Sequence, residues 1–261
     1  MLVASLGNLM RTWPWRNVIL RSVSVLGLYA VLAIEILSVF QVVNRVSISI
    51  IWTIPILISI ASLGYQKKSA EVFRKPSFTF PTSLVERFLL LSVAGILLLT
   101  AVIAWYAAPN TYDSLTYHMS RVAHWAQDNG VRPYATGILR QNYMSPGAEM
   151  AILHTYLLAF SDRFANFVQW GAMAISLIGV SLAAKELGTG GRGQLFAALF
   201  TASLPMGIAQ ATSTMTDYYT AMWVLIAAVE VLAFSREPGK PYPLLFAAAS
   251  AGLALLAKPT A

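Results

Sequence analysis

Cysteine is absent from the 261-residue sequence. Without a thiol the chain forms no disulfide framework, has no thiolate nucleophile and offers no cysteine ligand to zinc. Charged residues are also scarce, because Asp, Glu, Lys and Arg together make up only 11% of the chain. Soluble domains carry about a quarter. Polar side chains cannot cover a globule of this composition, so an ordinary soluble domain is excluded.

Apolar runs take the place of the missing charge. The chain is 57% hydrophobic with a mean hydropathy of +0.64, and several runs approach the roughly 20 apolar residues that cross a bilayer. We therefore expect an all-α, polytopic helical membrane protein with about seven transmembrane helices in a lipid bilayer. The expected spans lie near residues 18–43, 47–65, 87–107, 163–184, 194–211, 217–234 and 242–260.

The formal net charge of +7 is distributed in short clusters between these spans. It does not form the single basic patch typical of nucleic-acid binding, so no nucleic-acid partner is expected. By the positive-inside rule, the clusters predict a multi-pass cell-membrane protein with a cytoplasmic N-terminus and residues 108–162 and 212–216 outside. The cytoplasmic clusters are Arg11, Arg16 and Arg21, then Lys67, Lys68, Arg74 and Lys75, then Lys185 with Arg192, and finally Arg236 with Lys240.

The two ends of the chain carry separate expectations. The first apolar run, from Val18 to Val43, is too long for the core of a cleavable signal and predicts an anchor. At the other end the sequence stops at Ala261, directly after an apolar span. We expect an N-terminal fragment truncated there, with a natural C-terminus as the alternative.

The external loop 108–162 is the one long polar stretch, and it begins with an amphipathic pattern. At about 100° per residue, one arc of a helix over 113–128 is polar. We expect this helix to lie in the membrane interface and to end at Asn129–Gly130. A wholly solvated polar face is the alternative interpretation. The arc comprises Asp113, Tyr117, Arg121, His124 and Asp128.

A second interfacial helix is predicted from Gly147 to Phe160, after Pro146. Between the two helices, Arg140 lies in a polar Arg-Gln-Asn-Tyr sequence suited to an anionic or sugar ligand. Simple loop solvation with interfacial tyrosines is the alternative.

Two further charged residues lie at predicted outer ends of spans. A charged carboxylate such as that of Asp217 is energetically costly close to the membrane, so this residue is expected to be functional. The alternative is that Asp217 caps its own helix. Lys258 is expected to reach the interface or to hold a lipid phosphate. Glu35 and Glu230 lie within apolar spans without a partner evident from the sequence.

Several motifs resemble GT-C glycosyltransferases, of the branch with bacterial relatives of protein O-mannosyltransferases and the lipid A aminoarabinose transferase. The resemblance rests on residues 108 to 261 in family order, within a partial core of 87–261, whereas residues 1–86 would be two additional spans. The matching stretches are NTYDSLTYHMSRVAHWAQ, RQNYMSPGAEMAILH, SDRFANFVQW, TSTMTDYYTAMW and GLALLAKPTA.

This resemblance implies transfer of a sugar from a polyprenyl-phosphate donor to an acceptor outside the cytoplasmic membrane. Asp113 would be the catalytic acid of the first loop, acting as general base, and Asp217 the second acid. Lys258 would contact the donor phosphate, where negative charge builds as the glycosidic bond breaks. Tyr117, Arg121, His124 and Arg140, in the same loop, are expected to bind substrate.

The sequence departs from the family pattern at two places. Ser114 follows Asp113 where many members have Glu, and Met144 and Ser145 precede the loop proline where others have Lys or His. Arg140 and Arg121 are the two candidates for the missing positive charge. Two other functions stay open: a secondary transporter, and a non-catalytic membrane scaffold. No metal site is predicted, although Asp113 and Asp217 are possible oxygen ligands for a divalent cation.

Overall fold

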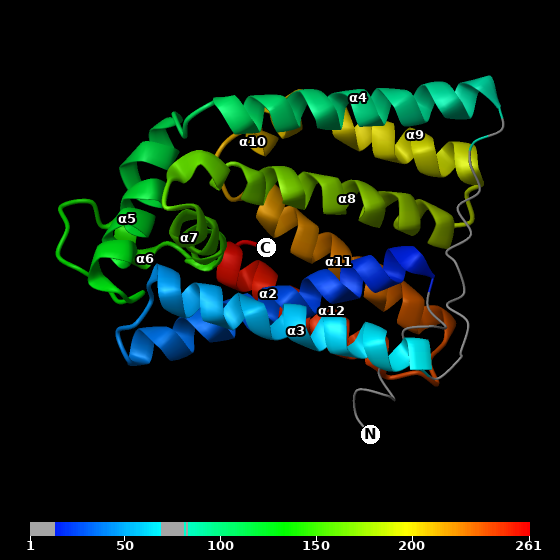
Figure 1. The fold of residues 1–261 in the computed structure, drawn as a ribbon. Helices are drawn as coiled ribbons and strands as arrows, with labels where there is room; N and C mark the ends of the chain where they lie inside the picture. Colours follow the sequence, from blue (N-terminus) through cyan, green and yellow to red (C-terminus); the bar gives the residue numbers. More distant parts are fainter. Residues whose placement is uncertain (1–13, 69–80, 82) are drawn as a thin grey trace.

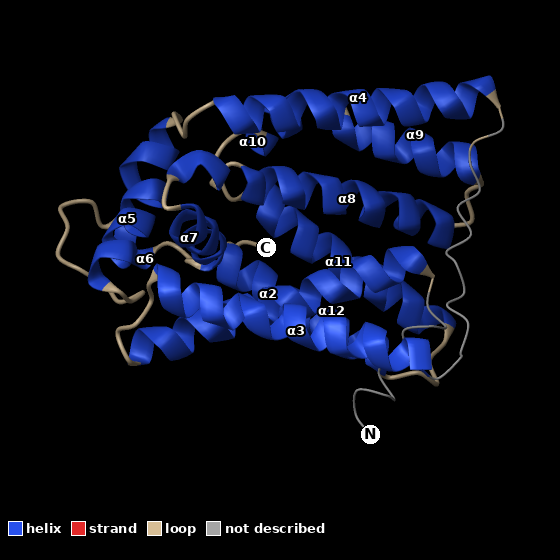
Figure 2. Cartoon of the chain, in the orientation of Figure 1, coloured by secondary structure: helices blue, strands red, loops and turns tan. Residues whose placement is uncertain are grey.

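Helices account for every regular element that the structure describes. The computed structural model describes residues 14–68, 81 and 83–261, without the side chains of 62–68, and this part contains no strand (Figure 2). The all-α class is confirmed. The bundle helices are α2 (Trp15–Val39), α3 (Arg45–Lys68), α4 (Leu84–Tyr106), α8 (Phe167–Glu186), α9 (Gly191–Ala202), α11 (Asp217–Arg236) and α12 (Tyr242–Ala257). The remaining elements are the π-turn η1 (Ser114–His118), α5 (Met119–Asp128), α6 (Arg140–Tyr143), α7 (Gly147–Ala159), η2 (Asp162–Phe164) and α10 (Pro205–Ala211).

The long helices form a bundle with two distinct ends. Helices α5, α6 and α7 lie together at one end, and the turns between α8 and α9 and between α11 and α12 lie at the other (Figure 1). At that other end, Arg236 pairs with Glu186 at 3.0 Å and Arg192 with Glu86 at 3.8 Å. This is the separation that alternating spans predict, whereas the membrane side of each end stays a prediction. The residues of the predicted cytoplasmic clusters that lie outside the described positions or side chains are Arg11, Lys67, Lys68, Arg74 and Lys75.

Among the residues that the structure describes, fewer helices are recognised as spans by length and hydropathy than the sequence predicts. Among the described residues, four are long and apolar enough: α2, α4, η2 with α8, and α11. Helices α9 and α10 add a fifth if they count as one bent span. Helix α3 is 24 residues long, but its side chains are described only over Arg45–Ala61, a part that is shorter than a span, and α12 is also shorter. A helical membrane protein is therefore supported, and the count of seven spans is not confirmed.

The predicted continuous span over 194–211 is broken by a 70° bend between α9 and α10. Pro205 begins α10, and Leu204 before it is extended, with φ −61° and ψ 120°. A proline has no N–H to continue the preceding helix, and its ring disfavours a helical conformation at the residue before it. The bend is therefore a direct consequence of the sequence at this point.

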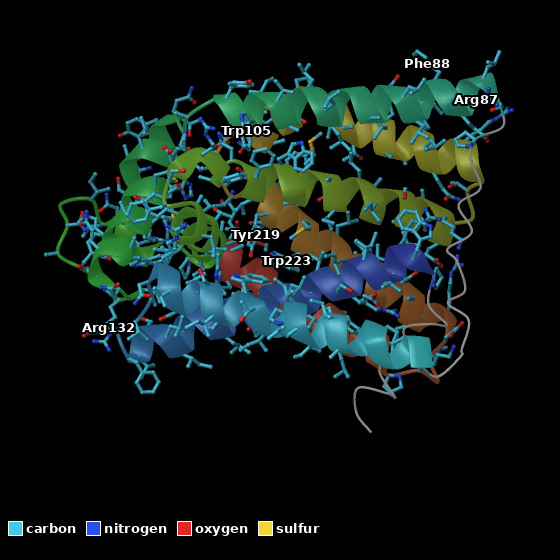
Figure 3. All side chains as sticks on the ribbon, viewed as in Figure 1. Arg87, Phe88, Trp105, Arg132, Tyr219 and Trp223 are labelled. Carbon is cyan, nitrogen blue, oxygen red and sulfur yellow. The ribbon has the colours of Figure 1, made fainter. Side chains whose placement is uncertain are left out.

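A continuous apolar core joins the N-terminal helices to the rest of the bundle. Leu20 of α2 is completely buried and shares a core cluster with Met173 of α8 and Trp223 of α11. At Gly27 of α2, an added Cβ would lie 2.5 Å from the Trp223 ring, so glycine permits this close approach. Figure 3 shows Trp223 and Tyr219 directed into the bundle. Helix α2 is thus packed as part of one core with α8 and α11, and Ile48 of α3 lies in a second core cluster with Leu153 of α7.

The outer faces of the long helices are apolar as well. On α4, Leu91 and Phe88 are 70% and 68% exposed, and Phe88 points away from the bundle in Figure 3. Exposed apolar faces on several long helices suit contact with lipid chains, because exposing apolar side chains to apolar lipid tails has no free-energy cost. These faces support the lipid bilayer as the environment of the bundle.

One buried ion pair lies inside the bundle and links α2 with α11. Arg21 donates from Nε and Nη2 to the two carboxylate oxygens of Glu230, each at 2.7 Å. The two side chains are 5% and 0% exposed. The guanidinium of Arg21 also stacks over the Tyr242 ring at 4.9 Å. Glu230, unassigned from the sequence, therefore has a bidentate partner 209 positions away.

Replacing Glu230→Leu is expected to destabilise the bundle by about 3–5 kcal/mol, because it leaves Arg21 as an uncompensated buried charge. Chemical unfolding of the purified protein in detergent measures this change. The double variant Arg21→Met with Glu230→Leu should recover most of the lost stability. Lys240→Gln, which removes an exposed pair with Glu237, is the control and should change little. Equal stability of Glu230→Leu and Lys240→Gln would contradict the assignment.

Candidate functional site

Two carboxylate–cation pairs form at the end of the bundle that carries α5, α6 and α7. Arg140 Nη1 of α6 lies 3.2 Å from Asp113 Oδ1, and Lys258 Nζ lies 2.9 Å from Asp217 Oδ1. Asp217 begins α11, and Lys258 directly follows α12. All four side chains are between 32% and 45% exposed. Four segments distant in sequence thus supply four charged groups that are accessible at one end.

Two hydrogen bonds tie the segments of these pairs together. Thr111 Oγ1 donates to Met215 Sδ at 3.5 Å, which places the start of the first loop beside the turn that leads into Asp217. Ser145 Oγ donates to the Leu255 carbonyl at 3.3 Å, which places the end of the α6 turn on the last turn of α12. The predicted grouping of Asp113 and Asp217 at a common end agrees with these contacts.

The local sequence around Asp113 leaves its carboxylate available. Thr111 Oγ1 accepts from the Ser114 backbone N–H at 3.2 Å and so satisfies a donor at the start of this helix. Asp113 itself makes no capping hydrogen bond, and its side chain instead faces Arg140. A helix start also favours a negative charge through the helix dipole.

Tyr117 lies beside this first pair. The Arg140 guanidinium stacks over the Tyr117 ring at 5.2 Å and over the Tyr112 ring at 5.8 Å. Burial, followed by the negative charges of Asp113 and Glu149, raises the pKa of Tyr117 to about 12. The phenol therefore stays protonated at neutral pH, and it can act as a hydrogen-bond donor at the Asp113 carboxylate.

Arg121 belongs to a buried cluster behind the first pair. Arg121 is 1% exposed, and its Nη1 lies 3.2 Å from Glu149 Oε1 in the first turn of α7. His118 Nδ1 lies 2.8 Å from the same oxygen. Within the described part of the chain, Glu149 Oε2 and His118 Nε2 have no hydrogen-bond partner. A histidine held by a carboxylate through Nδ1 keeps Nε2 as a proton acceptor when neutral.

His124 and Asp217 complete the set of predicted residues. His124 stacks on Tyr134 with ring centroids 4.0 Å apart, so it packs against the loop after α5 and apart from both ion pairs. Asp217, for which helix capping was the alternative, accepts a hydrogen bond from Lys258. Its position in the first turn of α11 also places its charge at the favourable end of the helix dipole.

The first interfacial helix departs from the predicted regular spacing. Residues Ser114–His118 form a π-turn, which shifts the following residues relative to an even 100° spacing. Tyr117 and Arg121 are buried while Leu115 is 57% exposed, so the alternative of an interfacial helix with a solvated polar face is wrong for those two residues. The predicted stop is confirmed, since Asn129 is left-handed with φ 52°. The second helix is also confirmed, as α7.

Sequence reasoning missed Glu149 and gave no role to His118. The available signal was an acid in the first turn of an otherwise apolar helix, directly after Pro146. Such an acid is expected to be paired when the helix is buried. Among the described residues, no group of three or more His, Asp or Glu side chains is placed to hold a metal ion. The divalent cation considered from the sequence therefore gains no such ligand group.

No protein-family model, curated protein or solved structure matches the chain in comparisons of its sequence and structure. The resemblance drawn from the motifs therefore carries no independent support from these comparisons, and what it implies enters below as a proposal.

Helix α7, which carries Glu149, is fastened to the two N-terminal helices through His154. Trp52 Nε1 of α3 donates to His154 Nδ1 at 3.2 Å, and His154 Nε2 donates to the Ala30 carbonyl of α2 at 3.0 Å. The contact with Trp52 requires the neutral ring, because a protonated Nδ1 cannot accept, whereas Nε2 can donate to the Ala30 carbonyl in either protonation state. Burial lowers the pKa of His154 below its ordinary value of 6.5, against a smaller opposite effect of the Ala30 hydrogen bond.

Thermal stability is therefore expected to fall as the pH decreases below about 6.5. The unfolded chain takes up a proton on His154 before the folded protein does, so the contribution of His154 is complete above that pH and is lost towards the lowered pKa. Unfolding temperatures measured between pH 7.5 and 5 test this. His154→Gln should flatten the slope, and His124→Gln, a histidine outside this contact, should keep it. Equal slopes in His154→Gln and the parent protein would refute the expectation.

Proposed function

We propose that the chain forms the membrane core of a glycosyltransferase that moves a sugar from a polyprenyl-phosphate donor to an acceptor on the extracytoplasmic side. The observation that supports this proposal is the pairing of Asp113 with Arg140 and of Asp217 with Lys258 at one end of an apolar bundle. This arrangement supplies carboxylates for proton transfer and cations for a phosphate within reach of lipid.

Asp113 is the residue proposed to take the proton from the acceptor hydroxyl. Its carboxylate is 32% exposed, so an acceptor can approach it without unfolding the loop. Arg140 fixes the carboxylate through Oδ1. A general base must lie within hydrogen-bond reach of the proton that it removes, and such a group contributes about 10²–10⁴-fold to the rate.

Lys258 is the residue proposed to hold the donor phosphate. Its ammonium has three donors, and the structure assigns one of them to Asp217. The remaining donors can bind a phosphate oxygen while the contact with Asp217 is kept. Negative charge develops on the phosphate as the bond to the sugar breaks, so a positioned cation stabilises the transition state more than the bound donor.

The apolar surroundings suit a donor with a long lipid chain. The exposed apolar faces of α2 and α4 lie along the bundle, with the charged pairs at its end. A polyprenyl chain in the bilayer would thus present its phosphate and sugar at the level of Asp217 and Lys258. The motif resemblance around Asp113, Asp217 and Lys258 adds to this support.

The bend between α9 and α10 favours a second candidate, a secondary transporter, because transporters use broken helices at their substrate sites. Solute flux in proteoliposomes separates the two functions. Transport by the protein without any sugar transfer would favour this second candidate.

Asp113→Asn is expected to lower sugar transfer by about 10²–10⁴-fold, because asparagine keeps the shape of the side chain and the contact with Arg140 but cannot accept the proton. The measurement is transfer from a polyprenyl-phosphate-linked sugar by the protein at its native length. Asp128→Asn, at the exposed end of α5, is the matched control and should retain activity. Undiminished transfer by Asp113→Asn would remove this residue from the chemistry.

Lys258→Gln is expected to lower kcat/KM for the lipid-linked donor by about 10²-fold, since the phosphate loses its charged partner in the transition state. The drop should be much smaller for Lys240→Gln, which removes a lysine at the opposite end of the bundle. Donor titrations at a fixed acceptor concentration provide the comparison. Equal kcat/KM values for the two variants would exclude Lys258 as a phosphate ligand.

A further inference from the structure

The guanidinium of Arg121 is surrounded by carbonyl oxygens of a single short turn. Nε donates to the Gln141 carbonyl at 2.6 Å, and Nη2 donates to the carbonyls of Arg140 at 2.9 Å and Met144 at 3.0 Å. Nη1 donates to the Ser145 carbonyl at 3.3 Å. Four carbonyls between 140 and 145 thus share one buried cation.

The Arg121 guanidinium supplies hydrogen-bond donors to backbone carbonyls of the turn 140–145. Helix α6 has only four residues, so most of its carbonyls have no partner within the helix. Its apolar packing is also weak, because Leu139 and Tyr143 are 73% and 66% exposed. The side chain of Gln141 adds contacts with Thr116 and Thr136, but Arg121 alone satisfies carbonyls along the whole turn.

Glu149 and His118 hold Arg121 in its buried position. The side chains of Glu149 and Arg121 are 0% and 1% exposed, and an isolated guanidinium in that environment would be costly. The Glu149 carboxylate compensates the charge through Oε1, which also contacts His118. Because Glu149 lies in the first turn of α7, its ion pair with Arg121 fixes the position of Arg121 relative to that helix.

The clamped turn reaches both ion pairs of the candidate site. At its start, Arg140 pairs with Asp113. At its end, Ser145 bonds to Leu255 in the last turn of α12, three residues before Lys258. Gly147 then packs so closely on Leu256 and Ala257 that an added Cβ would lie 3.0 Å from their backbone. The turn therefore spans the distance between the first pair and the end of α12.

We propose that Arg121, held by Glu149, is a positioning residue that fixes the turn 140–145 and, through it, the placement of Arg140 against Asp113 and of α12 before Lys258. In this role Arg121 acts through the turn and does not contact substrate. Its effect on sugar transfer rests on the proposed function, whereas its effect on the turn does not.

The absence of cysteine allows a direct test of the turn. A spin label on Tyr143→Cys, an exposed residue of α6, reports the mobility of the turn by electron paramagnetic resonance. We expect Arg121→Lys to sharpen the spectrum, because three donors on a flexible stem cannot reproduce the planar fork of arginine. Arg132→Lys is the matched control, since Arg132 in the same external loop donates only to the Val39 carbonyl in the described structure, and it should leave the spectrum unchanged.

Glu149→Gln provides a second variant in case Arg121→Lys does not fold, and it should sharpen the spectrum to a smaller extent. An unchanged spectrum in a folded Arg121→Lys protein, or in Glu149→Gln when that is the variant that folds, would overturn the proposal.

A kinetic cycle tests the link to the first pair. Arg121→Lys should lower kcat about tenfold in the parent protein, because small displacements of catalytic groups are costly. In the Arg140→Gln background it should lower kcat less than twofold, since the group that it positions is already gone. Equal losses in both backgrounds would indicate a general structural role and overturn the proposal. If the parent protein transfers no sugar, the proposed function fails, and the spin-label spectra alone decide the role of Arg121.

Discussion

A charge inside an apolar bundle must be paired, and this constraint governs where the few ionic side chains of the protein lie. Arg21 and Glu230 meet between α2 and α11 with both partners almost fully buried. Arg121 and Glu149 form a second buried pair at the polar end of the bundle, which is the end that carries α5, α6 and α7. In a medium with few water molecules, each of these charges alone would be strongly destabilising. The pairs therefore specify which helices can be neighbours, while apolar packing supplies the bulk of the stability.

Helix α7 connects the buried pair of Arg121 and Glu149 with the helices around the candidate site. Through His154 it is attached to α2 and α3, through Glu149 to Arg121, and through Gly147 to the end of α12. One helix thus sets the relative positions of the two N-terminal helices, the loop 108–162 and the last helix. The two N-terminal helices, which resemble nothing in the proposed family, consequently contribute to the geometry of the polar end.

Sequence periodicity was sufficient for features that depend on a few neighbouring residues. The stop at Asn129, the helix after Pro146 and the all-helical class are confirmed, and a membrane environment is supported, because capping, proline placement and hydropathy are local properties. The bend before Pro205 is also encoded locally. The prediction missed it because the apolar length of the run favoured one continuous span. By contrast, the periodicity indicated neither the π-turn at Ser114–His118 nor the burial of Tyr117 and Arg121.

Pairing between distant residues was not accessible from one sequence. Nothing local connects Arg21 with Glu230, or Glu149 with Arg121, because each partner appears as an isolated charge in an apolar or amphipathic stretch. Asp113 and Asp217 were expected at a common end from the charge clusters between spans and from alternation of the spans, which are properties of chain order. Their individual cation partners required the positions of α6 and α12.

The charge balance at the polar end places a further condition on the proposed transfer. Asp113 with Arg140 and Asp217 with Lys258 form two neutral pairs, so the resting site has no excess positive charge to attract a phosphate. A donor phosphate held by Lys258 must share this cation with Asp217, which is already bound to it. Its ground-state binding is consequently modest, whereas the interaction strengthens as charge accumulates on the leaving phosphate. Self-neutralised pairs of this kind favour the transition state over the bound substrate, which is the condition for raising kcat.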